Sequence, residues 1–403
     1  MSTLINFINN EKYLKQNDVI NFSTENKTPE QRVKLLIIRD LINLGWDIKF
    51  GKKIEVIPPG KYDKDTIKQA MSVKRLEIIN NNRFWIDKHI DIARANLADG
   101  SQVVLSSIDP VIEVCITQKQ KDLFRILRYY WSSPYSDYVG RRIKLIIRDN
   151  ALPNKPVIGI AALGSPIIHI PEREKFIGWD RQTKTKNIVF TMDAYVIGAL
   201  PPYNFLLGGK LISILLASKE IRKIYEEKYR GITTIIDKRE ANTLVGIFTT
   251  SLYGKSSQYN RLTYSNSLLY QTIGETRGYG TLHLSKETIQ GMVYYLKLRN
   301  VNVNRCFGDG PNWVMRVIEK AGELVGFDSD MLLKHSFKRY IYFLPLAENY
   351  REILNGGMCE PIYYDYFKED LVAYWKKRWF EKRIERTDVR EKVLKFNHRE
   401  FTI

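Results

Sequence analysis

Cysteine is scarce in this chain, and its three copies stand far apart, at Cys115, Cys306 and Cys359. No Cys-x-x-Cys pair is present, and none of the three has a histidine nearby at the spacing of metal ligands. This distribution argues against a structural zinc site and favours a reducing compartment.

Long apolar runs are also missing. Runs such as residues 211–217 are too short to cross a bilayer. The first residues, MSTLINFINNEKYLK, do not combine a charged start with a long apolar core, as a signal peptide would. We therefore expect a soluble, cytoplasmic protein without a membrane partner.

Several common catalytic patterns are absent as well. His169, His283 and His335 are separated in sequence, and no Ser-His-Asp or Cys-His arrangement can be assembled from the spacing. The glycine-rich stretch 274–280 follows an expected strand but lacks the Lys-Ser/Thr pair of a nucleotide-hydrolysing P-loop. The Pro-Asp…Asp/Glu-x-Lys string typical of many metal-dependent nucleases is also absent.

Positive charge is present in excess. The 403 residues include 63 Lys and Arg against 45 Asp and Glu, which gives a formal charge of +18. Such a surplus attracts polyanions, with nucleic acid as the first candidate and an anionic membrane surface as the second. The alternative is that the lysines only keep the protein soluble. At 403 residues the chain can bury a large core, and its length suggests two or three domains.

The sequence divides into three expected segments. Residues 1–107 form a helical and hairpin module, in which Thr28-Pro29-Glu30-Gln31 has the residue types of a helix start. A hairpin around Gly51-Lys52 and a helix over 64–80 follow, and the pattern is similar to a winged-helix module. In such a module Lys68, Lys74 and Arg75 would face phosphates.

Residues 108–284 alternate strands and helices, and residues 285–403 form a C-terminal helical, basic extension. Strands are expected over 111–117, 142–148, 156–164, 187–198 and 268–274. Helices are expected over 118–131, 207–222 and 256–262. The predicted fold class is α+β with a mixed sheet.

The stretch 156–180, PVIGIAALGSPIIHIPEREKFIGWD, resembles a buried strand that turns at Ser165 and delivers Trp179 and Asp180 to a loop. A strand that presents an aromatic and an acidic residue in this way often forms the wall of a cleft. The alternative is a core strand followed by a loop pinned by Trp179.

The order of elements over 111–274 resembles the Gcn5-related N-acetyltransferase (GNAT) fold. In that fold a central strand leads into a loop whose amides bind the pyrophosphate of coenzyme A at a helix N-terminus. The corresponding loop here is 203–211, with Gly208 and Gly209. The GNAT motif has Gln or Arg three residues before its glycine and Gly or Ala two residues after it, and neither Gly208 nor Gly209 has such neighbours. Coenzyme A binding is therefore in doubt. The resemblance implies that Tyr259 would be the general acid, although a packing role is the alternative.

Longer strings are more specific. SPIIHIPEREKFIGWD, TIGETRGYG, GPNWVMRVIEKAGE, LLKHSFKRYIYFLPLAENY and YWKKRWFEKR, in this order, resemble the DruA family of the Druantia anti-phage defence system. The resemblance covers residues from about 108 to 385. It implies a role in bacterial defence against phage, in an operon with other components that include a helicase-like protein.

The candidate nucleic-acid-binding residues are basic or aromatic and lie in three places. Aromatic residues set among basic ones can stack on bases or pack beneath phosphates. They are Arg277 and Tyr279 in the glycine-rich stretch; Lys334, His335, Lys338 and Arg339; and Trp375, Lys376, Lys377, Arg378, Trp379, Lys382 and Arg383 in the tail. The alternative, of equal weight, is an amphipathic helix that packs Trp375 and Trp379 on the body of the protein and leaves its lysines solvated.

Three residues are candidates for catalysis: Asp180, Glu275 and Tyr259. A metal nuclease would need clustered carboxylates, which Asp180, Asp193, Asp237, Glu275 or Asp309 would supply from loops. We predict a nucleic-acid-binding component, with DNA as the expected partner. The alternatives are an enzyme, either a GNAT-like transferase or a nuclease acting on phage DNA, and a scaffold that binds other defence proteins.

Overall fold

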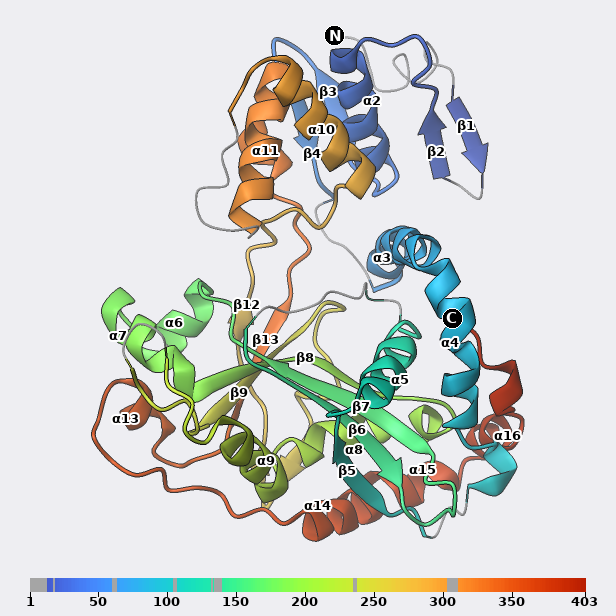
Figure 1. Cartoon of the computed structure of the whole chain (residues 1–403), viewed down its shortest axis with the longest axis vertical. Coiled ribbons are helices and arrows are strands. Elements are labelled where there is room, and N and C mark those ends of the chain that lie inside the picture. The colour runs from blue at the N-terminus through green and yellow to red at the C-terminus, as the bar shows by residue number, and fades with distance from the viewer. Residues whose placement is uncertain are drawn as a thin grey trace. The chain divides into compact units, whose positions relative to one another are not determined.

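A computed structural model describes residues 13–16, 19–59, 64–103, 107–131, 133, 140–234, 238–302 and 311–403. The chain forms two compact units, each made from two separate stretches of sequence (Figure 1). The first unit comprises Met1–Lys74 and Thr276–Arg339, and the second comprises Arg75–Glu275 and Tyr340–Ile403. The division into three consecutive segments stays a prediction.

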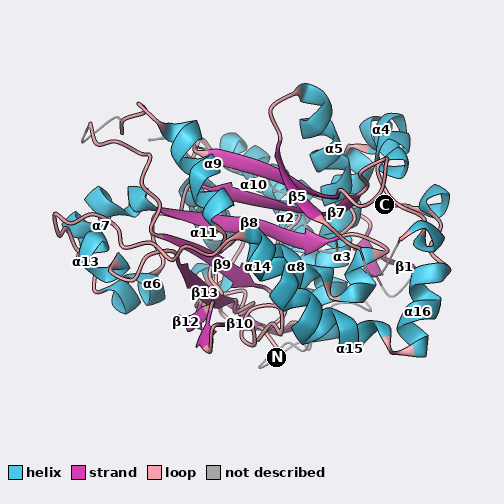
Figure 2. Ribbon diagram, turned by 90° about the horizontal axis from the view of Figure 1, so that it is seen from below, coloured by secondary structure: helices cyan, strands magenta, loops and turns pink. Residues whose placement is uncertain are grey.

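A seven-stranded sheet lies at the centre of the second unit (Figure 2). Its strands are β5 (Pro110–Val114), β6 (Arg142–Asp149), β7 (Val157–Gly164), β8 (Thr191–Ala199), β9 (Gly246–Ser251), β12 (Gln271–Glu275) and β13 (Tyr340–Pro345). They run in the order β12-β13-β9-β8-β7-β6-β5, and all neighbours are antiparallel except the parallel pair β8–β9. The predicted α+β class with a mixed sheet is confirmed.

The apolar run at the start of the 156–180 stretch forms β7, which pairs with β6 as the expected hairpin. Every residue of β7 is buried because helices cover both faces of the sheet. The prediction of a strand over 187–198 was wrong at its start. Asn187 ends a helix, a 3-10 turn occupies Ile188–Phe190, and β8 begins at Thr191.

One sheet face packs against helices whose apolar residues form the largest core. These helices are α8 (Gly208–Leu215), α9 (Lys219–Tyr229), α14 (Lys368–Trp375) and α16 (Thr387–Leu394). The opposite face has two smaller clusters. Helices α4 (Arg83–Ala95) and α5 (Gln118–Arg128) cover β6 to β8, whereas α6 (Pro171–Ile177), α7 (Arg181–Asn187) and α13 (Tyr350–Leu354) lie by β9 and β13.

Strands β8 and β9 separate partway along their length. They pair only from Thr191–Ala194 to Gly246–Thr249, and the β7–β8 register shifts at Tyr195, where a bulge bends the strand. Beyond the bulge, Gln258 reaches the free edge of β8. Its Nε2 donates to the carbonyl of Ile197 at 3.4 Å and to Ser213 Oγ at 2.8 Å. The chain's own segment thus fills the gap between the strands.

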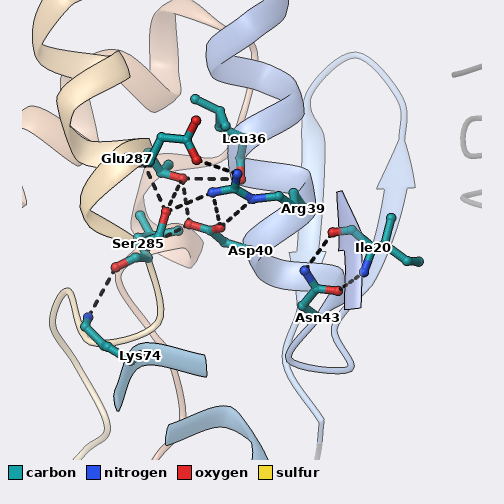
Figure 3. Close-up of polar contacts among 10 residues, drawn as sticks. Ile20, Leu36, Arg39, Asp40, Asn43, Lys74, Ser285 and Glu287 are labelled. Atoms are coloured by element: carbon teal, nitrogen blue, oxygen red, sulfur yellow. Dashed lines mark hydrogen bonds and ion pairs between the residues drawn. The ribbon is translucent and has the colours of Figure 1, made fainter. Parts of the chain in front are cut away.

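The first unit is built on α2 (Pro29–Ile42), which packs against α10 (Lys286–Leu298). Figure 3 shows the polar contacts between them: buried Asp40 accepts from the backbone N–H of Ser285 and from Thr288 Oγ1, both at 2.6 Å. Its other elements are the hairpins β1–β2 (Tyr13–Gln16, Val19–Phe22) and β3–β4 (Asp47–Phe50, Ile54–Ile57), α11 (Pro311–Leu324) and α12 (Ser329–Leu332). Helix α3 (Lys64–Asn81) begins in this unit and ends in the second.

Local signals placed the first helix and hairpin correctly. Thr28 caps α2 in a reciprocal capping box with Gln31, as the residue types predict. The hairpin around Gly51-Lys52 is also confirmed. By contrast, the helix expected over 256–262 is a series of turns, and the helix expected over 207–222 is two helices that break at Leu216–Ser218.

The C-terminal tail is helical over most of the expected length. Helix α14 continues through a π-helical turn at Lys376–Phe380 into α15 (Glu381–Ile384), and α16 follows. The remaining short elements are 3-10 turns at Gly100–Gln102, Tyr203–Leu206 and His398–Glu400, and the strand pair β10–β11 (Thr263–Tyr264, Ser267–Leu268).

Candidate functional site

Three segments that were predicted separately meet at the first turn of α8. They are the loop before α8, the turns over 252–262 and the C-terminal helices. Trp375 Nε1 donates to the carbonyl of Leu207 at 3.3 Å, and Arg383 Nε donates to the carbonyl of Phe205 at 3.0 Å. From the other side, Lys210 Nζ donates to the carbonyl of Ser257.

The two glycines at this turn allow the close packing. A Cβ on Gly208 would lie 2.6 Å from the carbonyl oxygen of Tyr203 and 2.8 Å from the Cβ of Ala199. A Cβ on Gly209 would lie 3.0 Å from Gln258 Oε1. The absence of a side chain at these glycines therefore lets neighbouring segments of the chain pack closely against them. Gln258 covers Gly209 at the place where a ligand would have to bind.

Cations gather around this junction. Lys210 Nζ lies 5.2 Å from the ring centroid of Trp379, the residue after Arg378. Exposed cations extend from there along 377–382 and onto the neighbouring turns. We define the tail surface as Lys210, Arg261, Lys377, Arg378 and Lys382. Apart from Lys210, none of them makes a side-chain hydrogen bond or ion pair with another described residue.

The pKa of Lys210 reflects its burial and the cations around it. Its pKa is lowered from 10.5 to about 8, first by burial and then by the positive charges of Arg261 and Arg378. Like charges at close range disfavour one another's ionised forms. A bound anion would relieve this repulsion.

The tail therefore combines the two alternatives left open by its sequence. Trp375 is buried at 1% exposure and packs on Phe380, with ring centroids 5.0 Å apart. Trp379, Lys376 and Lys210 are half-buried, whereas the other cations of the tail surface, Arg261, Lys377, Arg378 and Lys382, are exposed. In this conformation the aromatic residues anchor the helix and the cations face outward.

A second group of predicted residues comes together in the first unit. The glycine-rich stretch lies beside residues 333–339. The N–H of Ser336 donates to the carbonyl of Gly278 at 3.0 Å, and the N–H of Gly280 donates to the carbonyl of Leu333 at 2.9 Å. Gly278 has φ +65°, and a Cβ there would lie 2.8 Å from the Ser336 backbone. Only glycine fits this position without displacing the neighbouring backbone.

The side chains of this second group differ in exposure. Arg277, Lys334 and Lys338 are exposed, and we call these three residues the loop surface. Tyr279 beside them is 47% exposed, and Arg339 is half-buried.

His335 is buried, and its Nδ1 accepts from the N–H of Phe337 at 3.0 Å. Burial lowers its pKa to about 4, so the imidazole is neutral at pH 7. A neutral, buried ring offers no charge to a phosphate.

The predicted wing cations have partners within their own units. Lys74 Nζ donates to the carbonyl of Leu282 at 2.7 Å, and Arg75 Nη2 donates to the carbonyl of Tyr129 at 3.0 Å. Lys68 pairs with Asp65 at 3.2 Å. Side chains held in this way are poorly placed to contact phosphates.

The three catalytic candidates do not gather. Tyr259 is buried against Tyr342 in the core on one sheet face, and burial raises its pKa well above the ordinary value. Trp179, next to Asp180, packs in the cluster that contains Phe248 and Phe343 on the opposite face. Successive residues of a strand point to opposite faces, so the sheet itself separates Tyr259 from the 179–180 loop.

Asp180 and Glu275 have local structural partners. Asp180 caps α7, where it accepts from the N–H of Thr183 at 2.8 Å, and this hydrogen bond lowers its pKa. Glu275 ends strand β12 opposite Tyr340, and its hydrogen bond raises the pKa of that tyrosine. Asp237 and Asp309 lie outside the described residues. Within the described ranges, no three His, Cys, Asp or Glu side chains form a group that could hold a metal ion.

The two remaining cleft candidates have structural contacts. Ser165 Oγ accepts from the N–H of Arg141 at 2.9 Å and closes the end of the β6–β7 hairpin. Trp179 Nε1 donates to the carbonyl of Leu354 at 2.6 Å. Trp179 thus pins its loop to α13, as the alternative interpretation of the stretch proposed.

Asp193, expected in a loop, lies buried on β8. Its Oδ2 accepts from the N–H of Ile167 at 2.9 Å, and its Oδ1 has no partner among the described residues. The nearby Arg173 is fully buried and donates from Nη2 to the carbonyl of Ile168 at 3.2 Å. Burial outweighs the hydrogen bond and the Arg173 charge, and raises the pKa of Asp193 from 3.8 to about 6.

This pKa predicts a pH-dependent stability. Because the folded-state pKa of Asp193 lies above 3.8, its contribution is fully present below that pH and is lost as the pH rises through about 6. The loss amounts to roughly 3 kcal/mol. Asp193→Asn has no titrating group at this position and should not show this loss. The free energy of unfolding of the wild type, relative to that of the variant, should therefore decrease between about pH 4 and about pH 7. Urea unfolding at both pH values measures this. Equal pH dependence in the two proteins would contradict the assignment.

Among the described residues, no helix combines the length and apolar character needed to span a membrane. The model of the family described as Druantia protein DruA matches residues 61–356. A curated Druantia protein DruA from Escherichia coli (strain UMEA 4076-1) is 36% identical over 336 residues, which cover 82% of this chain and 82% of that protein. No solved structure matches the chain.

Proposed function

The chain belongs to the Druantia protein DruA family, and we propose that it is a nucleic-acid-binding component of a bacterial anti-phage defence system. The observation that carries the proposal is the tail surface. There burial and, after it, the charges of Arg261 and Arg378 lower the pKa of Lys210, and neither arginine has an acidic partner among the described residues. DNA is the expected ligand because a row of phosphates would satisfy several of these cations at once.

The contacts expected at this surface are with the phosphate backbone. Lys210 lies on α8, Arg261 on a turn, and the other cations on the helix anchored by buried Trp375; no exposed aromatic residue of the described part of the chain lies among them. Phosphate contacts position a nucleic acid without reading its sequence. The loop surface of the first unit, with half-exposed Tyr279, offers a second group of cations that fits the same ligand class. We therefore expect binding with little sequence preference.

For the second unit we propose a GNAT-like fold. The expected element order from β5 to β9 and the passage from β8 into the loop before α8 support it. The residues do not fit coenzyme A, however, because Gln258 covers Gly209 where the pyrophosphate would lie. The N-terminal helix and hairpin keep the order proposed for a winged-helix module. We further propose a cytoplasmic location and partners from the same operon, such as the helicase-like protein.

Binding to single- and double-stranded DNA at several salt concentrations tests the proposed function. The logarithm of the binding constant should fall linearly with the logarithm of the salt concentration. A slope of about −4 is expected if four cations of the tail surface each neutralise one phosphate. Micromolar or weaker affinity at low salt without a salt dependence would refute nucleic-acid binding.

A further inference from the structure

The second unit contains a cavity of about 400 Å³ that the proposed function does not use. It lies where α13 packs beside α7 (Figure 1). Its walls come from the end of α7, the 3-10 turn that follows, the segment 239–243 and the turn after α13. Cavities of this size accommodate small organic ligands.

Arg239 supplies the charge in this cavity. Its Nη1 donates to Asn187 Oδ1 at 2.6 Å and to the carbonyl of Lys186 at 3.2 Å, which fixes one edge of the guanidinium. The Nε and Nη2 atoms of Arg239 make no hydrogen bond to a described residue. Neither atom belongs to the fully buried polar atoms that lack a partner, so both are accessible. Arg239 also makes no ion pair with a described carboxylate. The Nε–Nη2 edge is thus available as a two-pronged donor.

A rigid backing holds this arginine. Asn187 is 2% exposed, and its Nδ2 donates to the carbonyl of Leu354 at 3.0 Å. The same carbonyl accepts from Trp179 Nε1 at 2.6 Å. The loop that ends the 156–180 stretch therefore braces the wall of the cavity from behind. Such backing keeps a recognition group in place before a ligand arrives and lowers the entropy cost of binding.

The other walls are mixed in chemistry. The guanidinium of Arg239 lies 5.8 Å from the ring centroid of Phe190, which also lines the cavity. The thiol of Cys359 is uncharged at pH 7, because burial and neighbouring Glu352 raise its pKa. The lining residues include one acid, exposed Glu360. An anion would therefore face one fixed cation, with an aromatic surface beside it.

We propose that this cavity binds a small organic anion. Its carboxylate or phosphate group would accept two parallel hydrogen bonds from Nε and Nη2 of Arg239, and its body would pack against Phe190. Bidentate pairs of this kind are stronger and more directional than single hydrogen bonds. The site is separate from the tail surface and does not depend on nucleic-acid binding.

Thermal unfolding with three probes tests the proposal: inorganic phosphate, adenosine monophosphate and benzoate. We expect saturable stabilisation of the wild type by adenosine monophosphate or benzoate, which distinguishes a phosphate ester from a carboxylate. Inorganic phosphate should act more weakly, because it lacks a body to contact Phe190. Failure of both organic probes to stabilise the wild type at millimolar concentration would overturn the proposal.

Matched variants separate this cavity from the rest of the protein. Arg239→Gln removes the charge, and Arg239→Lys keeps the charge but lacks the two-pronged donor edge. Both variants should therefore bind the stabilising probe at least about tenfold more weakly than the wild type does. Arg378→Gln, on the tail surface, should leave the response unchanged. If Arg239→Gln and Arg239→Lys respond as the wild type does, or if Arg378→Gln abolishes the effect, the cavity is not the binding site.

Discussion

Replacing Arg261, Lys377 and Arg378 together by glutamine is expected to weaken binding to double-stranded DNA about a thousandfold at about 50 mM salt. The three side chains are exposed and make no ion pair with another described residue, so their removal breaks no internal contact. Each phosphate contact contributes about −0.9 to the salt slope. If affinities converge at about 1 M salt, one contact corresponds to roughly tenfold at about 50 mM.

A control variant of equal charge separates a local effect from a general one. Lys119 on α5, Lys175 on α6 and Arg181 on α7 are exposed cations on helices that pack on the opposite sheet face. Replacing all three by glutamine changes the net charge equally and should cost much less affinity. Fluorescence anisotropy with one labelled duplex compares both variants with the wild type. Equal losses would mean that the overall field, and not the tail surface, attracts DNA.

Trp375→Ala is expected to lower the free energy of unfolding by about 3–5 kcal/mol. The indole is 1% exposed, packs in the main core and donates from Nε1 to the carbonyl of Leu207. Its removal leaves a cavity and an unpaired carbonyl, and detaches the helix that carries the tail cations from the loop before α8.

Trp379 provides the matched control, four residues further along the same helix. It is half-buried and contacts Tyr374 edge-on, with ring centroids 5.5 Å apart. Trp379→Ala should therefore lower the free energy of unfolding clearly less than Trp375→Ala does. Urea unfolding of both variants measures the difference. If Trp379→Ala were equally or more destabilising, the packing of the tail described here would be wrong.

Much of the second unit follows from local sequence signals. The run VIGIAALG has enough apolar residues to predict a fully buried strand, and the turn before it predicts its pairing with 142–148. Asp180, interpreted as a catalytic acid, also had a signal for its actual role, because an aspartate directly before a helix is a common N-cap.

The contacts between segments that lie far apart in the chain could not be predicted from one sequence. Strands β12 and β13 pair although residues 276–339 fold as part of another unit between them. No periodicity indicates which strand a strand will pair with across such an insertion. Likewise, Gln258 fills the gap beyond the β8 bulge, and only the packed structure places Arg261 beside Lys210.

The most direct test of the central claim is the salt slope of DNA binding, measured side by side for the wild type and the Arg261/Lys377/Arg378 glutamine variant. If these cations neutralise phosphates, the slope should be about 3 smaller in magnitude in the variant, and the affinities should converge near about 1 M salt. An unchanged slope with the same loss of affinity at every salt concentration would show that the tail surface does not contact the nucleic-acid backbone.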